Sequence, residues 1–214
     1  FIYNGTDSSN SAGGQDSLQF TKLMTLLGSQ YDVQTTNLDK NFETEQPEML
    51  IVAGIKSPLN GAAVDAIKKY LTSNGRALFL LDKVINDPSS TTATPKTTGL
   101  EALLSDYGVG LNSDLVYDLA LAETIQFSRG QQAFLVPYPF WFKALPADTK
   151  FPPTSQIRAV SLLWPGSLTL TQRDGFEAKT IVKTSRNAGV LTGENFNISP
   201  DKLTEAAFKP GGKE

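Results

Sequence analysis

The chain contains no cysteine and no histidine, and these two absences exclude several kinds of chemistry. Without histidine, neither a Ser-His-Asp nor a Cys-His arrangement can form, and the commonest general base near neutral pH is missing. Zinc and iron sites lose their usual imidazole and thiolate ligands for the same reason. We therefore expect no catalytic residue, no metal site and no cofactor.

Strong charge and long apolar runs are also lacking. Lys and Arg number 19 and Asp and Glu number 22, a net charge of −3 over 214 residues, whereas nucleic-acid binding typically needs a clustered basic face. All apolar runs are far shorter than the roughly 20 residues of a membrane-spanning helix. We expect no nucleic-acid partner, and contact with a membrane only through segments outside this chain. A first residue Phe1 rather than Met favours a piece of a longer precursor.

Residues 49–82 predict a strand, a helix and a second strand. The short apolar runs at residues 50–53 and 77–81 are typical of parallel strands that are covered on both faces. Between them, one side of an amphipathic helix carries the apolar residues Ala63, Val64, Ile67, Tyr70 and Leu71. Because such a connection between parallel strands crosses over right-handedly, a layered α/β sheet follows.

The ends of this helix show recognisable capping residues. The helix begins either at Ser57, with Pro58 as its first residue, or at Asn60. Asn74 and Gly75 end it, and we expect Gly75 to take the left-handed conformation that glycine adopts without steric cost.

The rest of the chain divides near residue 118. The first part predicts strands at residues 1–3, 31–36 and 115–117 and helices at residues 16–27 and 99–107. The second part is punctuated by proline and offers strand candidates at residues 134–136, 158–162 and 180–183. We predict one α/β domain over residues 1–214, with a doubly wound core at residues 1–118 that an irregular, proline-rich second half at residues 119–214 completes. The polar segment at residues 87–98 is either a lid or, as its composition favours, a disordered insertion.

Ligands of open α/β sheets bind beyond the carboxyl ends of the strands. Three loops, at residues 5–14, 53–57 and 82–87, should meet there. A lone lysine or aspartate in a loop is more often a solvated charge or a cap than a ligand contact. The candidate ligand-binding residues are Gly5, Thr6, Asp7, Lys56, Ser57 and Asp82.

Aromatic residues gather at residues 137–142, with Trp164 as a second candidate surface. The two prolines of this stretch predict a rigid loop or an edge segment. Its aromatic rings either fill a secondary core, contact a partner subunit or stack on a sugar ring. The candidate interface residues are Tyr138, Phe140, Trp141, Phe142 and Trp164.

Five stretches in fixed order carry a family resemblance. They are VAGIKSPLNGAAVDAIKKYLTSNGRALFLLD, GLEALLSDYGVGLNSDLVYD, VPYPFW, the segment Trp164-Pro165-Gly166-Ser167-Leu168, and IVKTSRNAG. In these stretches the chain resembles the Gldg family, the auxiliary component of a bacterial ABC-type transport system associated with gliding motility. One departure is the first loop, where Asn4 to Ser9 replaces the Gly-His-Gly-Glu-like turn of many members.

The resemblance implies a fold and a setting. The implied fold is α/β, Rossmann-like or flavodoxin-like, with three layers and a mainly parallel central sheet, as in class I glutamine amidotransferases; a related domain occurs in an intraflagellar transport subunit. The implied setting is extracytoplasmic, on the periplasmic side, with the full-length protein anchored in the membrane. Implied partners are the ABC transporter permease and ATPase subunits, a second auxiliary subunit or a second copy of the chain.

The resulting functional hypothesis is a non-enzymatic extracytoplasmic domain of an ABC-transporter auxiliary protein that acts through protein contacts. The alternative is a small-molecule or carbohydrate-binding domain that uses the strand-end crevice. A hydrolase that relies on carboxylates alone is a third possibility.

Overall fold

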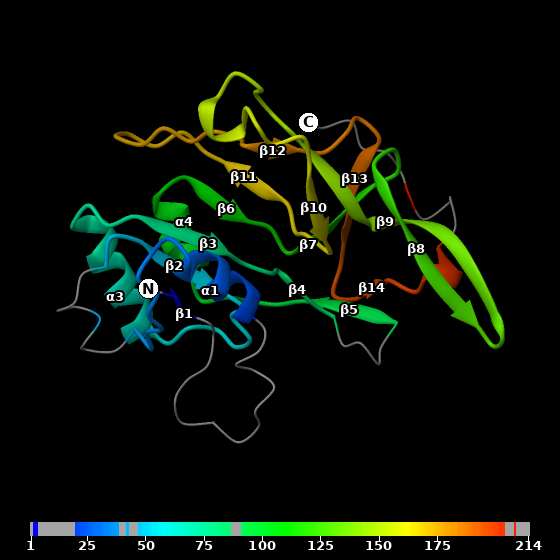
Figure 1. The fold of residues 1–214 in the computed structure, drawn as a ribbon, viewed down its shortest axis with the longest axis horizontal. Coiled ribbons are helices and arrows are strands. Elements are labelled where there is room, and N and C mark those ends of the chain that lie inside the picture. The colour runs from blue at the N-terminus through cyan, green and yellow to red at the C-terminus, as the bar shows by residue number, and fades with distance from the viewer. Residues whose placement is uncertain are drawn as a thin grey trace. The chain divides into compact units, whose positions relative to one another are not determined.

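A computed structural model describes residues 2–3, 20–38, 42, 47–86, 91–203 and 208 (Figure 1). The chain divides into two compact units. The first consists of Phe1–Leu81 and Thr97–Leu103, and the second of Asp82–Lys96 and Leu104–Glu214. The expectation that residues 1–214 form one domain stays a prediction.

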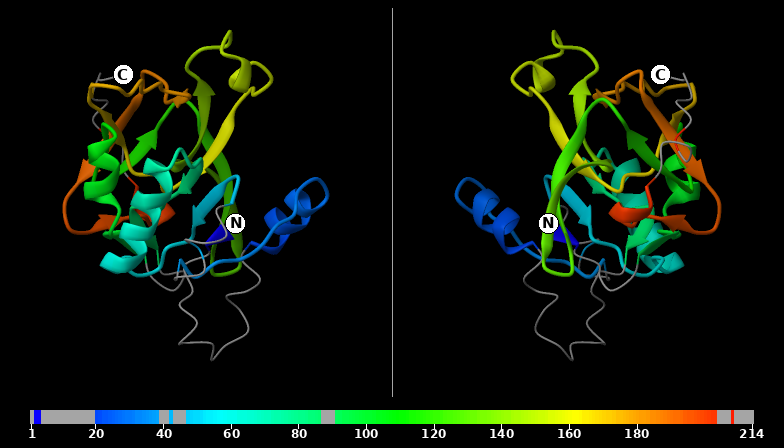
Figure 2. Two further views of the ribbon diagram at one scale, coloured as in Figure 1. Left: turned by 90° about the vertical axis from the view of Figure 1, so that its left-hand side faces the viewer. Right: turned by 90° about the vertical axis from the view of Figure 1, so that its right-hand side faces the viewer.

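Three short parallel strands organise the first unit. They are β1 (Ile2–Tyr3), β2 (Leu50–Ala53) and β3 (Ala77–Leu80), in the order β1-β2-β3. The helices α1 (Thr21–Gly28) and α3 (Gly61–Thr72) lie on opposite sides of β2 (Figure 2). The order of β2, α3 and β3 along the chain confirms the predicted strand, helix and strand. All four residues of β2 are buried.

Two expectations about this unit are wrong. β3 is not covered on both faces, because Leu78 and Leu80 are exposed while Ala77 and Phe79 are half-buried. The strand predicted at residues 31–36 is reduced to one parallel bridge between Thr35 and Ile2. The helix predicted at residues 16–27 is described only from residue 20, and there α1 begins at Thr21.

The caps of α3 select between the two predicted starts. The side chain of Asn60 accepts a hydrogen bond of 2.9 Å from the Ala63 N–H, so the later start is correct. The left-handed residue at the other end is Asn74, with φ of 67°, and not Gly75. Gly75 is needed for a different reason, because a Cβ there would lie 2.5 Å from the Tyr70 ring and 2.6 Å from the Tyr70 carbonyl oxygen.

The polar segment before the short helix α4 (Glu101–Asp106) is ordered where the structure describes it. Residues 92–95 form β5 (Thr92–Pro95), in which Ala93 is fully buried. The Glu101 carboxylate accepts hydrogen bonds from the Thr98 and Gly99 N–H groups at 2.8 and 2.9 Å, a capping arrangement. A disordered insertion is therefore wrong for residues 91–98, while residues 87–90 lie outside the described part.

The second unit consists mainly of antiparallel strands. β14, β5 and β4 form one sheet, β11 pairs with β6, β13 pairs with β7, and β8, β10 and β12 all pair with β9. The bounds not given above are β4 (Val84–Asn86), β6 (Val109–Leu111), β7 (Asp114–Asp118), β8 (Ala122–Arg129), β9 (Gln132–Pro146), β10 (Val160–Leu163), β11 (Leu168–Leu170), β12 (Val182–Lys183), β13 (Ala188–Thr192), β14 (Phe196–Asn197), and the 3-10 helices η3 (Pro152–Thr154) and η4 (Pro200–Lys202).

The predicted fold class is therefore wrong. Strands predominate over helices, and among the described strands only β1, β2 and β3 pair in parallel, so the chain is not a three-layer, Rossmann-like or amidotransferase-like fold with a mainly parallel central sheet. The missed element is the β8 and β9 hairpin, closed by Gly130 and Gln131. Gly130 has φ of 61°, which suits the first position of a tight hairpin turn.

Gly75→Ala should lower the free energy of unfolding by about 1 to 3 kcal/mol, because the added methyl group overlaps the Tyr70 ring. Gly61→Ala is the matched control, since no atom lies within 4 Å of a Cβ added there. Its stability should stay the same or rise by less than about 1 kcal/mol, as alanine favours the helix. Denaturant unfolding measures both, and equal effects would contradict the proposed overlap.

Candidate functional site

The aromatic stretch at residues 137–142 lies within the long strand β9, so the predicted loop is wrong. The alternative, an edge segment, fits residues 137–140, which among the described strands β8 alone borders. Its prolines sit where the pairing tolerates them. Pro137 pairs with Thr124 of β8, in a part of β9 that β10 does not reach. Pro139 falls at an irregularity of register, because Glu123 pairs with Tyr138 while Ala122 pairs with Phe142. Bulges are among the few places where a sheet accepts proline.

Three of the five candidate interface side chains are buried. Tyr138, Phe140 and Phe142 are 2%, 0% and 1% exposed. Tyr138 and Phe140 pack in the main cluster of the second unit, and Phe142 in a smaller cluster with Val116 and Ala144. The half-buried Trp141 and Trp164 pack against the main cluster. Their role as an interface stays a prediction, and burial leaves the two tryptophans as the more accessible members.

Tyr138, Trp141 and Trp164 form an aromatic triad with fixed geometry. The Trp141 and Trp164 rings meet edge to face, with centroids 4.9 Å apart, and Tyr138 lies 5.7 Å from Trp141. The Trp164 indole N–H donates a hydrogen bond of 3.0 Å to the Tyr138 hydroxyl, which donates one of 2.8 Å to the Ile198 carbonyl. Trp164 has φ of 48°, and its backbone N–H donates to the Phe140 carbonyl at 2.9 Å.

The two polar groups of the triad differ in their environment. Burial raises the pKa of Tyr138 to about 12, and the hydrogen bond from Trp164 opposes this because it stabilises the phenolate. The buried indole N–H of Trp141 has no partner among the described residues. An unpaired buried donor is unusual in proteins and costs about 1 to 3 kcal/mol.

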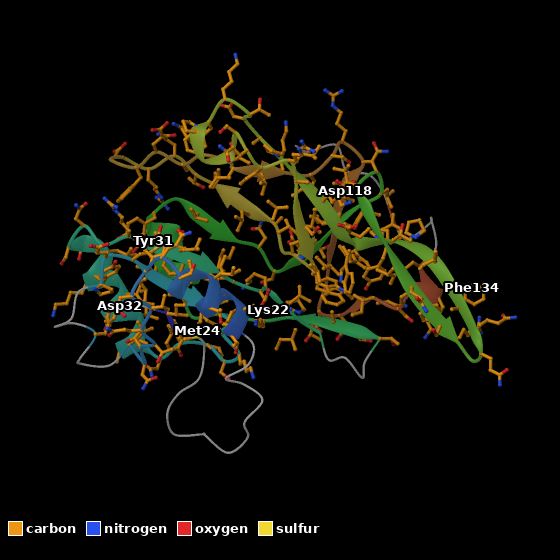
Figure 3. The ribbon with its side chains drawn as sticks, viewed as in Figure 1. Lys22, Met24, Tyr31, Asp32, Asp118 and Phe134 are labelled. Atoms are coloured by element: carbon orange, nitrogen blue, oxygen red, sulfur yellow. The ribbon has the colours of Figure 1, made fainter. Side chains whose placement is uncertain are left out.

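Two buried carboxylates lie at the ends of β7, and no prediction singled them out. Asp114 accepts hydrogen bonds from the Ser167 N–H and hydroxyl at 2.7 and 2.6 Å. Asp118, which is labelled in Figure 3, is fully buried. It accepts hydrogen bonds from the Ser185 N–H and hydroxyl, both at 2.7 Å. It also accepts from the backbone N–H groups of Ala120 and Leu121.

These carboxylates join distant parts of the second unit. Ser167 lies in the WPGSL stretch and Ser185 in the IVKTSRNAG stretch, so three of the five stretches that carry the family resemblance meet at β7. The sequence signal was a pair of aspartates that flank an apolar strand, Leu115 to Tyr117. Their serine partners, 53 and 67 residues away, left no local signal.

The six candidate ligand-binding residues are distributed over both units. Gly5, Thr6 and Asp7 lie outside the described residues. Lys56 and Ser57 are exposed in the loop after β2, in the first unit, as predicted for that loop. Asp82 is exposed in the second unit. Their role in ligand binding stays a prediction.

Asp82 affects a nearby lysine. Burial lowers the pKa of Lys96, the charge of Asp82 opposes this, and Lys83 adds to the lowering.

The first unit contains a pocket of about 190 Å³. It lies at the amino ends of the strands β2 and β3, whereas the predicted crevice lies at their carboxyl ends. Its lining residues precede the strands β2 and β3 or end the helix α3; among them are Glu48, Lys69, Tyr70 and Arg76. The Tyr70 hydroxyl lies 3.0 and 2.9 Å from the Pro47 and Arg76 carbonyl oxygens. No group of three or more potential metal ligands gathers in the part of the chain that the structure describes.

The raised pKa of Tyr138 predicts a loss of stability at high pH. Between the ordinary value of 10.0 and about 12, the folded chain keeps a proton that the unfolded chain loses, so the free energy of unfolding should fall as the pH rises through this range. Tyr138→Phe should remove this part of the slope, and Tyr31→Phe, at an exposed position, should keep it. Denaturant unfolding at several alkaline pH values measures the slope, and identical slopes for all three proteins would contradict the prediction.

Asp118→Asn should lower the free energy of unfolding by about 2 to 3 kcal/mol, because an amide nitrogen cannot accept the hydrogen bonds that a buried carboxylate oxygen accepts. Asp174→Asn makes the same chemical change at an exposed position and should have almost no effect. Thermal and denaturant unfolding compare the two variants. A loss below about 0.5 kcal/mol in Asp118→Asn would show that β7 does not depend on this carboxylate.

Three comparisons with known proteins bear on the family and the fold of this chain. A search of the curated proteins finds no significant match. Among solved structures, the chain is similar to the mmIFT52 N-terminal domain, with a TM-score of 0.54 and 18% identity over 88% of this chain and 79% of that chain. At this identity the similarity concerns the fold alone. Residues 6–213 match the family described as ABC-type uncharacterized transport system. Because the match covers almost the whole chain, this protein belongs to that family of ABC-transport auxiliary proteins.

Proposed function

We propose that the chain is a non-enzymatic, extracytoplasmic part of its ABC-transport auxiliary protein and acts by binding other protein subunits of the transport system. Membership of the family carries the transport role. The association with permease and ATPase subunits, the periplasmic location and the membrane anchoring of the full-length protein are parts of the proposal. None of the described helices combines the length and the apolar character that a membrane crossing requires.

The observation that carries the binding role is the apolar end of the β8 and β9 hairpin. Phe134 and Leu135 are 44% and 75% exposed, and Figure 3 places Phe134 near this end. β9 pairs only with β8 before residue 141, among the strands that the structure describes. A two-stranded ribbon is marginally stable in water, and exposed large apolar side chains favour contact with another protein surface.

The absence of catalysis is supported by the use of the polar groups. The chain has no histidine or cysteine, and its half-buried Ser167 and Ser185 hydroxyls donate to buried carboxylates that accept backbone hydrogen bonds as well. A carboxylate used in this way stabilises the fold, and no imidazole is present to activate a hydroxyl.

Ligand binding in the strand-end crevice has less support. The pocket in the first unit lies at the amino ends of its strands, and its tyrosine hydroxyl is already used by backbone groups. The crevice therefore stays a prediction from the sequence.

Co-purification of the full-length protein with the permease and ATPase subunits of its own transport system tests the binding role. Leu135→Glu should weaken this association at least tenfold, equivalent to about 1.4 kcal/mol, because it charges the exposed apolar end. Gln132→Glu, an exposed polar position on the same hairpin, should leave it unchanged. An unaltered association of a folded Leu135→Glu protein would contradict the proposed surface. Turnover of glutamine, a glycoside or an ester that disappears in Asp82→Asn would contradict the absence of catalysis.

A further inference from the structure

The strand β8 has one edge that no other described strand occupies. β8 pairs with β9 along its whole length and with nothing else in the described ranges. Figure 1 shows the hairpin extending past the other labelled strands of the second unit. Such an edge presents a row of backbone N–H and C=O groups that can pair with another strand.

This edge lacks several of the features that usually prevent pairing, although it carries a charged residue near each end, Glu123 and Arg129. Natural edge strands are often protected by proline, lysine or bulges. The sequence of β8, AETIQFSR, contains neither proline nor lysine, and its irregularity of register lies at its very start, between Ala122 and Glu123. Residues 123–129 are therefore a regular edge of seven residues.

The sequence of this edge is complementary to itself. When two copies run antiparallel about a two-fold axis at Gln126, each Ile125 lies opposite a Phe127 and each Thr124 opposite a Ser128. Each Glu123 then lies opposite an Arg129. Opposite charges and apolar pairs that face each other across strands are stabilising, and no like charges meet in this register.

We propose that two copies of this chain pair antiparallel through β8 and form a continuous four-stranded sheet, β9-β8-β8-β9. This deepens the proposed function, since it names a second copy as one protein partner. The contact is isologous, so it closes after two copies.

The cross-strand pairs within each hairpin extend the apolar contact. Ile125 pairs with Val136 and Phe127 pairs with Phe134, and directly opposed residues share one face. Pairing of the two β8 strands therefore joins two apolar rows into one that crosses all four strands. Burial of this surface and the new backbone hydrogen bonds stabilise the dimer.

The charged pair mainly selects the register. Glu123 already lies 3.6 Å from the Lys143 ammonium and accepts a hydrogen bond from Ser161, and its side chain is 29% exposed. Arg129 helps to lower the pKa of Asp201, after the larger effect of the hydrogen bond from Ser199. Partly solvated charges that already have neighbours contribute more to specificity than to affinity.

Single cysteines test the two-fold register directly, because the natural chain has no thiol. In the proposed dimer, residue 126 faces its own copy, at a Cβ separation of about 4.5 to 5.5 Å that a disulfide can bridge after a small shift. Residue 124 lies four positions out of register from its copy, roughly 14 Å away. Mild oxidation should cross-link Gln126→Cys, and should not cross-link Thr124→Cys or Ser128→Cys alone. A mixture of these last two proteins should form the mixed disulfide.

Sedimentation measures the association without a cross-link. The wild-type chain should form dimers, and Gln126→Lys should weaken them at least tenfold because two ammonium groups meet at the axis. Thr124→Lys adds the same charge to the same face but places it opposite Ser128, so it should weaken association less.

Three results would overturn the proposal. The first is a chain that stays monomeric at millimolar concentration. The second is cross-linking of Thr124→Cys or Ser128→Cys alone that is as efficient as cross-linking of Gln126→Cys. The third is binding of the chain to lipid vesicles without self-association. Co-purification of Gln126→Lys with the transporter subunits separates the two proposals. If dimers are absent but this co-purification persists, the self-pairing is wrong and the proposed function stands.

Discussion

The second unit depends on the two buried aspartates that end β7. A carboxylate removed from water is destabilising unless hydrogen bonds compensate it, and both aspartates meet that requirement with serine residues from remote parts of the chain. The WPGSL segment is thereby joined to one end of β7, and the segment before β13 to the other. β13 then pairs with β7 along its full length, from Asp114 to Asp118. These hydrogen bonds hold together strands that each have only a few residues.

The aromatic triad provides the apolar counterpart of these polar contacts. Trp164 follows β10 in a left-handed conformation, which is unfavourable for a tryptophan. Its N–H bond to Phe140 and its indole bond to Tyr138 compensate this cost. The Trp164 and Asp114 contacts both involve the segment between β10 and β11, so one short stretch joins β9 to β7. We infer that the resemblance of this stretch to the family reflects stability of the fold.

Groups that stabilise the second unit and groups that are available for binding lie in different places. The two buried aspartates and the Tyr138 hydroxyl of the second unit already have hydrogen-bond partners within it. The hairpin, in contrast, exposes large apolar side chains and an edge that no other described strand pairs with. Exposed apolar side chains and free strand edges do not contribute to the core, so they are the features at which binding to another protein is expected. The hairpin therefore has more support as a binding surface than the predicted strand-end crevice.

The sequence by itself determined the elements whose signals are local. The first strand, helix and strand unit was predictable because hydrophobic periodicity, Asn60 and the Asn74-Gly75 pair all lie within one short segment. The excluded histidine and cysteine chemistry and the family were also evident from residue types and motifs. The stabilising role of Asp114 and Asp118 was not evident, since their hydrogen bonds form only when Ser167 and Ser185 approach.

Tertiary structure alone decided the class of the fold and the fate of the aromatic stretch. The prolines at residues 137 and 139 contradict a strand locally, and only pairing with β8 and β10, with an irregular register, accommodates them. Antiparallel pairing joins residues that are far apart in the chain, as Asp114 and Thr192 are, and no periodicity in the sequence records such partners. Local patterns therefore specified single elements, and long-range hydrogen bonding specified how they are assembled.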